Sequence, residues 1–329
     1  MGERGGRERQ QEREGQSSEE AEHDETDNGT EEDGTAEDGT ASNDTAWNGK
    51  AEQVRSTVTR RSVLRRIVSR RIVLGPFVHP DLTTLAASLD AILAPADDPV
   101  LVLRERAAPV ARLGLALEPW PGLRAWVDAA ALDAVLLHRH WALSLDRWPA
   151  AVGVLASHDA FDRRYGFGRT PELADALSLT LGDARDSLGD RDGHPLGSVG
   201  TVRAGGGVDV DTLRAALVRT FGGVEAELAP SRAIAPTARV AMARAMTPAL
   251  VERAAALGAG AYVTGQLRAP AREAALRAEL HVFAVGHRRA EEWALARLAE
   301  AVRGVWPALR TMIAENGGAE NGTTEDGTA

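Results

Sequence analysis

Strands and helices alternate regularly through the last third of the chain, and this pattern constrains the fold more than any other feature. The predicted elements are strands at 239–243, 261–264 and 281–285, and helices at 248–257, 270–279 and 288–302. Two parallel strands can be joined only by a crossover connection, which is usually a helix. Strands that alternate with helices therefore predict an α/β fold with largely parallel sheets.

A short apolar run earlier in the chain is the first candidate for a functional position. Ala134–Leu137 follows a predicted helix at 121–132 and is typical of a buried strand in an α/β sheet. Two histidines, His138 and His140, come next. Because side chains alternate across a strand, we expect both imidazoles to point to the same side. Ligands bind at the carboxyl ends of strands in open α/β sheets, so this strand end is a candidate site.

Two further pairs of residues can converge on the same edge of a sheet. His158 and Asp162 follow a predicted strand at 153–156, and His287 and Glu291 follow the strand at 281–285. Each pair has the spacing i, i+4, which puts both side chains on one face of a helical turn.

We interpret the three pieces together as one metal site. The predicted ligands are His138, His158, Asp162, His287 and Glu291, with His140 as a further candidate. The chain has no cysteine, so sulfur ligands, disulfides and thiolate catalysis are excluded. Imidazole with carboxylate is a coherent ligand set for a divalent metal such as Zn, Fe, Mn or Co. Taken alone, a His-x-His pair at a strand end is more often a partly buried histidine pair, and the two i, i+4 spacings occur by chance in a chain of this length.

The two ends of the chain differ in composition from its middle. Residues 1–54 and 313–329 are dominated by Glu, Asp, Gly, Thr and Asn, and the net charge of the whole chain is −10. Such segments cannot bury enough apolar surface to offset the entropy of the chain, so we predict disordered acidic tails. We interpret them as solvating tails; a docking role is the alternative.

A basic segment at 55–76 separates the acidic tail from the predicted folded part. Seven arginines lie between Arg55 and Arg71, with apolar residues at helical spacing among them. This pattern indicates a basic amphipathic helix. It could contact an anionic membrane surface or a nucleic acid, or it could lie on the folded body or against the acidic tail.

The remaining body is nearly neutral, so we expect no nucleic-acid surface on it. No apolar run approaches the length of a membrane span, and the amino terminus lacks the pattern of a signal peptide. We therefore expect a cytoplasmic protein. The other predicted elements are strands at 100–103, 110–117 and 224–228, helices at 81–93, 171–181 and 211–220, and a long surface loop within 182–208.

The order of these pieces resembles one known family, the dinuclear metal centre, hexameric proteins (Nif-three-like, often labelled GTP cyclohydrolase 1 type 2 homologues). The motifs that carry the resemblance are Asp133 with His138-Arg139, His158-Asp-Ala-Phe-Asp162, Thr264-Gly265-Gln266 and Gly286-His287-Arg-Arg-Ala-Glu291. Together they cover roughly residues 80–310.

The resemblance implies a two-lobed subunit with mixed, largely parallel sheets flanked by helices. Residues 77–312 would form it, one lobe comprising about 77–170 with 239–312 and the other 171–238. It also implies a homohexamer with metals inside. The implied function is a metal-dependent hydrolase of a nucleotide-like or phosphorylated small molecule. The alternative is a non-catalytic scaffold that binds or handles metal, or a hexameric assembly hub.

The chain departs from the family pattern at four places. Arg139 stands where the family has a second histidine, Gln266 stands where it has a glutamate, and Arg244 begins the turn where it has glycines. The family's amino-terminal Trp-Asp-Asn-x-Gly segment is not recognisable in this sequence. A guanidinium is always charged and cannot bind a metal. The site could then hold one metal or, with His140 as a substitute ligand, two; loss of the metal is the remaining alternative.

Overall fold

The structure is a computed structural model of the chain. It describes residues 78–94, 98–168, 170–191, 193–231 and 235–315. The predicted acidic tail at 1–54 and the predicted basic helix at 55–76 lie outside these residues, as does the second tail from residue 316 onward. Residues 313–315, which we assigned to that tail, are part of the fold, because the last strand ends at Ile313 and the amide of Ala314 donates to the carbonyl oxygen of Leu115 at 2.9 Å.

The first sheet has five strands, and candidate site residues follow two of them, β3 and β4. The strand order is β1-β4-β3-β2-β12, in which β12, β2, β3 and β4 are parallel and β1 is antiparallel. The strands are β1 (Leu101–Arg104), β2 (Arg112–Ala116), β3 (Ala134–Leu137), β4 (Gly153–Ala156) and β12 (Arg310–Ile313).

Helices cover both faces of this sheet. α2 (Leu82–Leu93) and the long α9 (His287–Val305) pack on one face, where their leucines meet Leu113 and Leu136. α3 (Leu123–Ala129) packs on the other face against Val135. Successive side chains of each strand therefore point into one core or the other, as in a parallel sheet buried on both faces. Burial on both faces explains why the strands consist almost entirely of apolar residues.

The second sheet has seven strands, in the order β5-β7-β9-β10-β11-β8, with β6 paired to β7. The strands β9, β10 and β11 are parallel, and the others are antiparallel to their neighbours. The strands are β5 (Leu179–Leu181), β6 (Ser187–Arg191), β7 (His194–Val202), β8 (Ala226–Leu228), β9 (Arg239–Ala243), β10 (Ala261–Thr264) and β11 (His281–Ala284).

Successive residues of the second sheet face two separate cores. Ala241 and Tyr262 contribute to the core under α7 (Pro248–Ala256) and α8 (Ala269–Arg277), which lie on one face. Met242 and Phe283 contribute to the core on the other face, under α5 (Pro171–Ala176) and α6 (Val210–Phe221). The short α4 (Asp159–Tyr165) follows β4, and single 3-10 turns occupy Leu145–Arg147 and Ala184–Asp186. The mixed α/β fold with helix-flanked sheets is confirmed.

Two local predictions are wrong. The helix expected at 171–181 ends at Ala176, and Ser178 follows with a φ of 56° before β5 begins. The expected loop within 182–208 contains the hairpin of β6 and β7. β7 contains glycines and polar residues and is buried only in its centre. Its sequence therefore lacks the clear apolar alternation that predicts a strand.

The strands also group differently from the predicted lobes. β9, β10 and β11 pair with β7 and β8 in the second sheet, whereas we grouped residues 239–312 with residues 77–170. Within that range, α9 packs against the first sheet, as expected. Hydrogen bonding between distant strands determines the grouping, and the sequence order does not reveal it. Among the described residues, no helix is both long and apolar enough to cross a membrane.

Candidate metal centre

His138 is the buried centre of the candidate site. It follows β3 directly and is only 2% exposed. Its Nδ1 lies 3.2 Å from the carbonyl oxygen of Ser157, which follows the neighbouring strand β4. A carbonyl only accepts hydrogen bonds, so this contact favours the tautomer with the proton on Nδ1. The Nε2 lone pair is then left to face the site.

Asp162 and Glu291 face the free nitrogen of His138. The Nε2 atom lies 3.5 Å from Oδ1 of Asp162 and 3.3 Å from Oε1 of Glu291. Nε2 is nevertheless buried without a hydrogen bond of acceptable geometry among the described residues. A buried basic nitrogen without a partner is costly in a protein interior. An imidazole fixed from behind and directed at carboxylates is the usual arrangement of a metal ligand.

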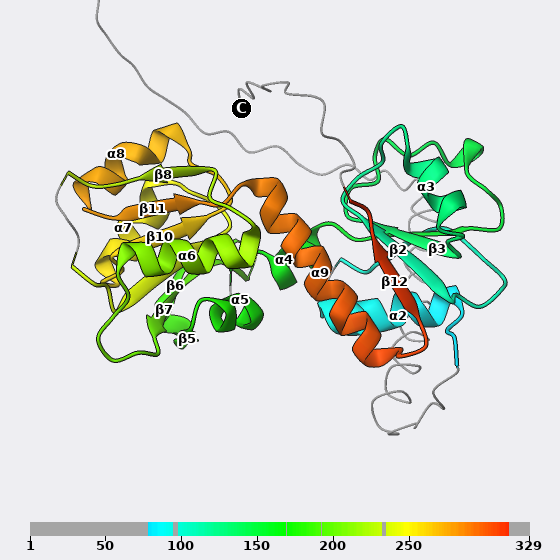
Figure 1. Cartoon of the computed structure of the whole chain (residues 1–329), viewed down its shortest axis with the longest axis horizontal. Coiled ribbons are helices and arrows are strands. Elements are labelled where there is room, and N and C mark those ends of the chain that lie inside the picture. Colours follow the sequence, from blue (N-terminus) through cyan, green and yellow to red (C-terminus); the bar gives the residue numbers. More distant parts are fainter. Residues whose placement is uncertain (1–77, 95–97, 169, 192, 232–234, 316–329) are drawn as a thin grey trace, which may run out of the picture. The chain divides into compact units, whose positions relative to one another are not determined.

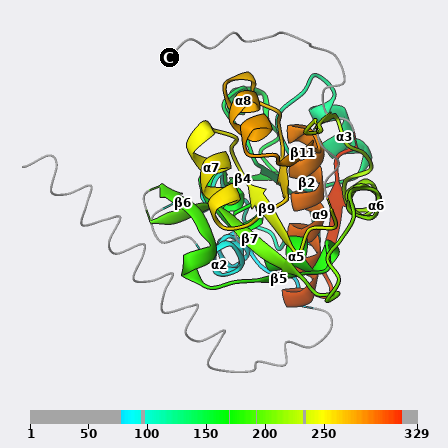
Figure 2. The same cartoon turned by 90° about the vertical axis from the view of Figure 1, so that its left-hand side faces the viewer.

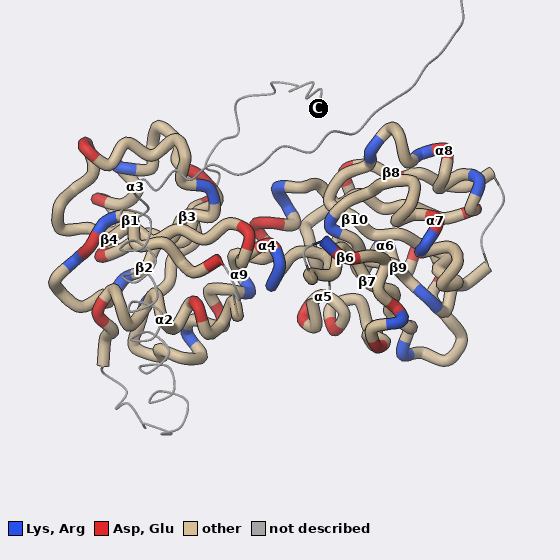
Figure 3. The backbone as a smooth tube through the Cα atoms, turned by 180° about the vertical axis from the view of Figure 1, so that it is seen from behind, with Lys and Arg blue, Asp and Glu red and all other residues tan. Residues whose placement is uncertain are grey.

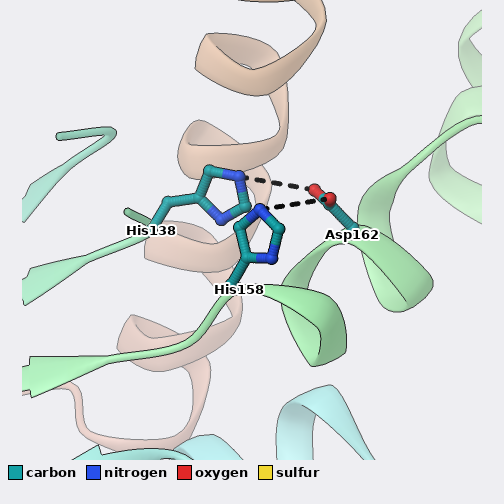
Figure 4. Close-up of side chains that lie close together, drawn as sticks. All are labelled: His138, His158 and Asp162. Atoms are coloured by element: carbon teal, nitrogen blue, oxygen red, sulfur yellow. Dashed lines mark ion pairs between the residues drawn. The ribbon is translucent and has the colours of Figure 1, made fainter. Parts of the chain in front are cut away.

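His158 completes a group of three donors. It precedes α4 and stacks on His138 with ring centroids 4.7 Å apart. Its Nδ1 lies 2.8 Å from Asp159, and its Nε2 lies 4.0 Å from Oδ2 of Asp162. Figure 4 shows the nitrogen atoms of both rings facing the carboxylate of Asp162. One donor atom from each of His138, His158 and Asp162 lies within 4.8 Å of the other two, which is close enough to hold one metal ion.

The residues at the start of α9 approach the same point. Gly286 has a φ of 99°, a conformation that favours glycine, and α9 begins at the next residue. His287 then lies with its Nε2 3.1 Å from Oε1 of Glu291, one turn later. The His287 side chain is mostly exposed, whereas Glu291 is 6% exposed. The hydrogen bond to Glu291 raises the pKa of His287.

Arg139 binds the carboxylate of Glu291 at both oxygens. The distances are 2.6 Å from Nη1 to Oε1 and 2.9 Å from Nη2 to Oε2. Burial alone would raise the pKa of Glu291, but its hydrogen bonds with His287 and Arg139 outweigh the effect of burial and hold that pKa well below its usual range. Glu291 is therefore ionised, and its charge is neutralised by a guanidinium in the place where a metal ligand was expected.

A second acidic residue extends this network. Glu118 accepts from Nε of Arg139 at 3.0 Å and from Nη1 of Arg288 at 2.8 Å. Figure 3 shows acidic and basic residues close together around α4. Glu118 was not among the predicted site residues, although it follows β2 by two residues. The convergence of parallel strand ends at one edge could have indicated it.

The other predicted residues lie in different places. His140 is not among the three residues whose donor atoms come together, and its Nδ1 is buried without a partner among the described residues. β3 ends at Leu137, so the alternation that we used to place His140 beside His138 does not apply. Asp133 has a structural contact: it accepts from the amides of Ala111 and Arg112, both at 2.9 Å.

The donor set fits a divalent metal at His138, His158 and Asp162. The unpartnered Nε2 of His138, the Nε2 of His158 and the adjacent carboxylate of Asp162 are the nitrogen and oxygen ligands that such ions bind. The geometry includes no thiolate or carbonyl cage, so the site is suited to an imidazole-binding metal rather than to Ca²⁺ or Mg²⁺.

Comparison with known proteins identifies relatives of this chain. The profile of the Duf34/NIF3 (NGG1p interacting factor 3) family matches residues 148–315. No curated protein matches the chain.

Solved structures share the fold. A structure described as protein ybgI, of unknown function, superposes with a TM-score of 0.57 at 18% identity, covering 73% of this chain and 100% of its own. Reduced HcgD from Methanocaldococcus jannaschii has a TM-score of 0.54 at 15% identity, covering 72% of this chain and 98% of its own. A Bacillus cereus protein related to NIF3 has a TM-score of 0.51 at 13% identity, covering 73% and 98%.

Proposed function

This chain belongs to the Duf34/NIF3 family, and we propose that it binds one divalent metal ion through His138, His158 and Asp162 and uses it to hydrolyse a phosphorylated, nucleotide-like small molecule. The observation that carries the proposal is the buried Nε2 of His138, which has no hydrogen-bond partner among the described residues and faces two carboxylates. GTP is one candidate substrate, because the sequence resembles GTP cyclohydrolase 1 type 2 homologues.

The residues around the metal position have separate roles in this proposal. His138 and His158 supply neutral nitrogens, and Asp162 supplies negative charge. When bound, such a metal lowers the pKa of its water and polarises a phosphoryl or carbonyl oxygen. His287 lies exposed beside Glu291, where its raised pKa favours the protonated ring, so it can donate a proton to a leaving group. Arg139 holds Glu291 in place and adds a positive charge at the edge of the site.

Turnover tests the proposal directly. The full chain is loaded with Zn²⁺, Mn²⁺, Fe²⁺ or Co²⁺ and incubated with GTP, other nucleotides and simple phosphate esters. We expect metal-dependent hydrolysis that is lost in Asp162→Asn, which keeps the shape of the side chain but removes the anionic ligand. Hydrolysis by the metal-free protein, or by Asp162→Asn at the wild-type rate, contradicts the role of this site.

A scaffold that binds or handles metal is the second candidate, and the Arg139–Glu291 ion pair favours it. Glu291 is already neutralised, so fewer free ligands remain for catalysis at the metal. This candidate predicts tight metal binding with no turnover of any compound in the same panel.

We also propose a homohexamer, as the resemblance to hexameric proteins implies. Light scattering coupled to gel filtration should give a mass close to six times 34.9 kDa. A monomeric mass at micromolar concentration contradicts the hexamer and leaves the metal site unaffected.

A further inference from the structure

A cavity of about 250 Å³ lies beside the candidate metal centre. Asp162, His287 and Glu291, which we assign to or beside the metal position, form part of its wall. Phe161 connects the two places, because its ring lines the cavity and lies 4.8 Å from the ring of His138. A molecule in this cavity would therefore reach the metal position at one end.

Aromatic side chains form much of the remaining wall. Phe167, Phe221 and Trp293 follow one another with ring centroids 5.6 and 5.7 Å apart, and Phe161 and Tyr165 form a second pair at 5.9 Å. Flat, apolar walls of this kind favour a planar ring, because stacking and tilted ring contacts add to the burial of apolar area.

Arg244 supplies positive charge to the same cavity. It follows β9, is half-buried, and has no ion pair or hydrogen bond from its side chain among the described residues. Its aliphatic stem lies against Gly166, where an added Cβ would come within 3.1 Å of Cγ of Arg244. Most of the other arginines close to the centre are paired, as Arg139 is with Glu291 and Arg164 with Glu172. Arg244 is therefore a partly desolvated cation that is available to a ligand.

The charges along the cavity also indicate how a ligand would be oriented. Glu291 is neutralised by Arg139, and a metal ion at the centre would offset the charge of Asp162. The cavity is then positive at Arg244 and at the exposed Arg191, which lines it as well. A planar guanidinium binds phosphate and carboxylate at two oxygens, so it selects an anion by geometry as well as by charge.

We propose that this cavity binds a molecule that consists of a planar ring and an anionic group, with Arg244 as the residue that selects the anion. The shared chemistry is a phosphate or a carboxylate attached to an aromatic ring. The inference deepens the proposed function, because it rests on the metal centre as the place of reaction and defines the class of substrate that the adjoining cavity accepts. Arg244 stands where the resembling family has a glycine-rich turn, so the selectivity belongs to this chain.

Binding of four simple probes tests the inference. The full chain, both metal-free and Zn²⁺-loaded, is titrated with 1-naphthyl phosphate, 1-naphthoate, the uncharged 1-naphthol and inorganic phosphate, and binding is followed by calorimetry. We expect at least one of the two anionic rings to bind about tenfold or more tightly than both the neutral ring and phosphate alone, since an added ion pair of about 1.4 kcal/mol corresponds to that factor. The preferred anion distinguishes a phosphate ester from a carboxylate as the natural group.

Variants at Arg244 separate its role from folding. Arg244→Met keeps the unbranched stem against Gly166 and should abolish the preference for anionic rings, while binding of 1-naphthol stays within about twofold. Arg244→Lys keeps the charge and should retain part of the preference. Arg272→Met is the matched control, because Arg272 is an exposed arginine of α8 outside the cavity lining.

The outcomes distinguish this inference from the proposed function. Anion preference in the metal-free chain that disappears in Arg244→Met supports the inference even if no metal binds. Equal binding of all four probes, no binding of any ring, or an unchanged preference in Arg244→Met overturns it. Failure of the metal centre would appear separately, as a lack of bound Zn²⁺ in the loaded sample.

Discussion

Changing Arg139 to histidine should create a second metal position. In the native chain the guanidinium of Arg139 binds both oxygens of Glu291, whose side chain is 7% exposed. Two unit charges about 4 Å apart interact by about 4 kcal/mol at an effective dielectric constant of about 20. A cation that competes for Glu291 must overcome an interaction of that order. This corresponds to an affinity that is weaker by roughly three powers of ten.

Arg139→His removes that competitor and adds a neutral imidazole donor. We expect the native chain to retain one metal per chain after loading with Zn²⁺ and dialysis, and Arg139→His to approach two. The metal-free variant should also be less stable, because removing one partner of a buried pair costs about 3–5 kcal/mol. Added Zn²⁺ should restore much of that loss. Elemental analysis gives the metal ratio, and thermal unfolding with and without Zn²⁺ gives the stability.

Two variants control this experiment. Arg139→Gln removes the charge without adding an imidazole, so its gain in metal should be smaller. Arg310→His adds an imidazole at an exposed position of β12 and should leave the ratio at one. The idea that Arg139 takes the place of a metal is wrong if the native chain holds two metals. It is also wrong if Arg139→His holds only one metal and binds Zn²⁺ with the same affinity as the native chain.

Three further predictions concern single residues. His158→Ala should lower the Zn²⁺ content well below one per chain, measured by elemental analysis, because one of three donors is lost. Gly286→Ala should reduce the melting temperature and weaken Zn²⁺ binding, because its φ of 99° costs a residue with a Cβ about 1–3 kcal/mol and α9 starts there. Burial raises the pKa of Tyr165 to about 12, so the stability that its neutral form contributes is present below pH 10 and is lost as the pH rises towards 12. The free energy of unfolding of Tyr165→Phe, measured with denaturant, should therefore depend less on pH between pH 10 and 12. If this variant loses as much stability in that range as the native chain, the assignment is wrong.

Local pattern was sufficient to predict the elements that bear the site. The apolar runs Ala134–Leu137 and Gly153–Ala156 are strands with the predicted bounds, because strands buried on both faces consist of little else. The same runs placed His138 and His158 at adjacent strand ends, and the structure brings them together. Here periodicity and the geometry of parallel sheets agree, so the residues could be named before the fold was known.

The features that the sequence did not predict depend on contacts between residues that are distant in the chain. His140 was assigned by strand alternation, but β3 ends at Leu137, before alternation can apply. The bidentate pair of Arg139 and Glu291 joins residues 152 positions apart, and spacing carries no information about it. The same holds for Arg244, whose place in the cavity depends on the packing of α4 and α9 around it.

The measurement that tests the metal centre most directly is anomalous diffraction at the zinc absorption edge from crystals of the Zn²⁺-loaded full chain. We predict one strong peak per chain, about 2.0–2.2 Å from Nε2 of His138, from Nε2 of His158 and from a carboxylate oxygen of Asp162. A zinc ion bound by other residues, or no peak at these three side chains in crystals of the loaded protein, would contradict the proposed metal centre.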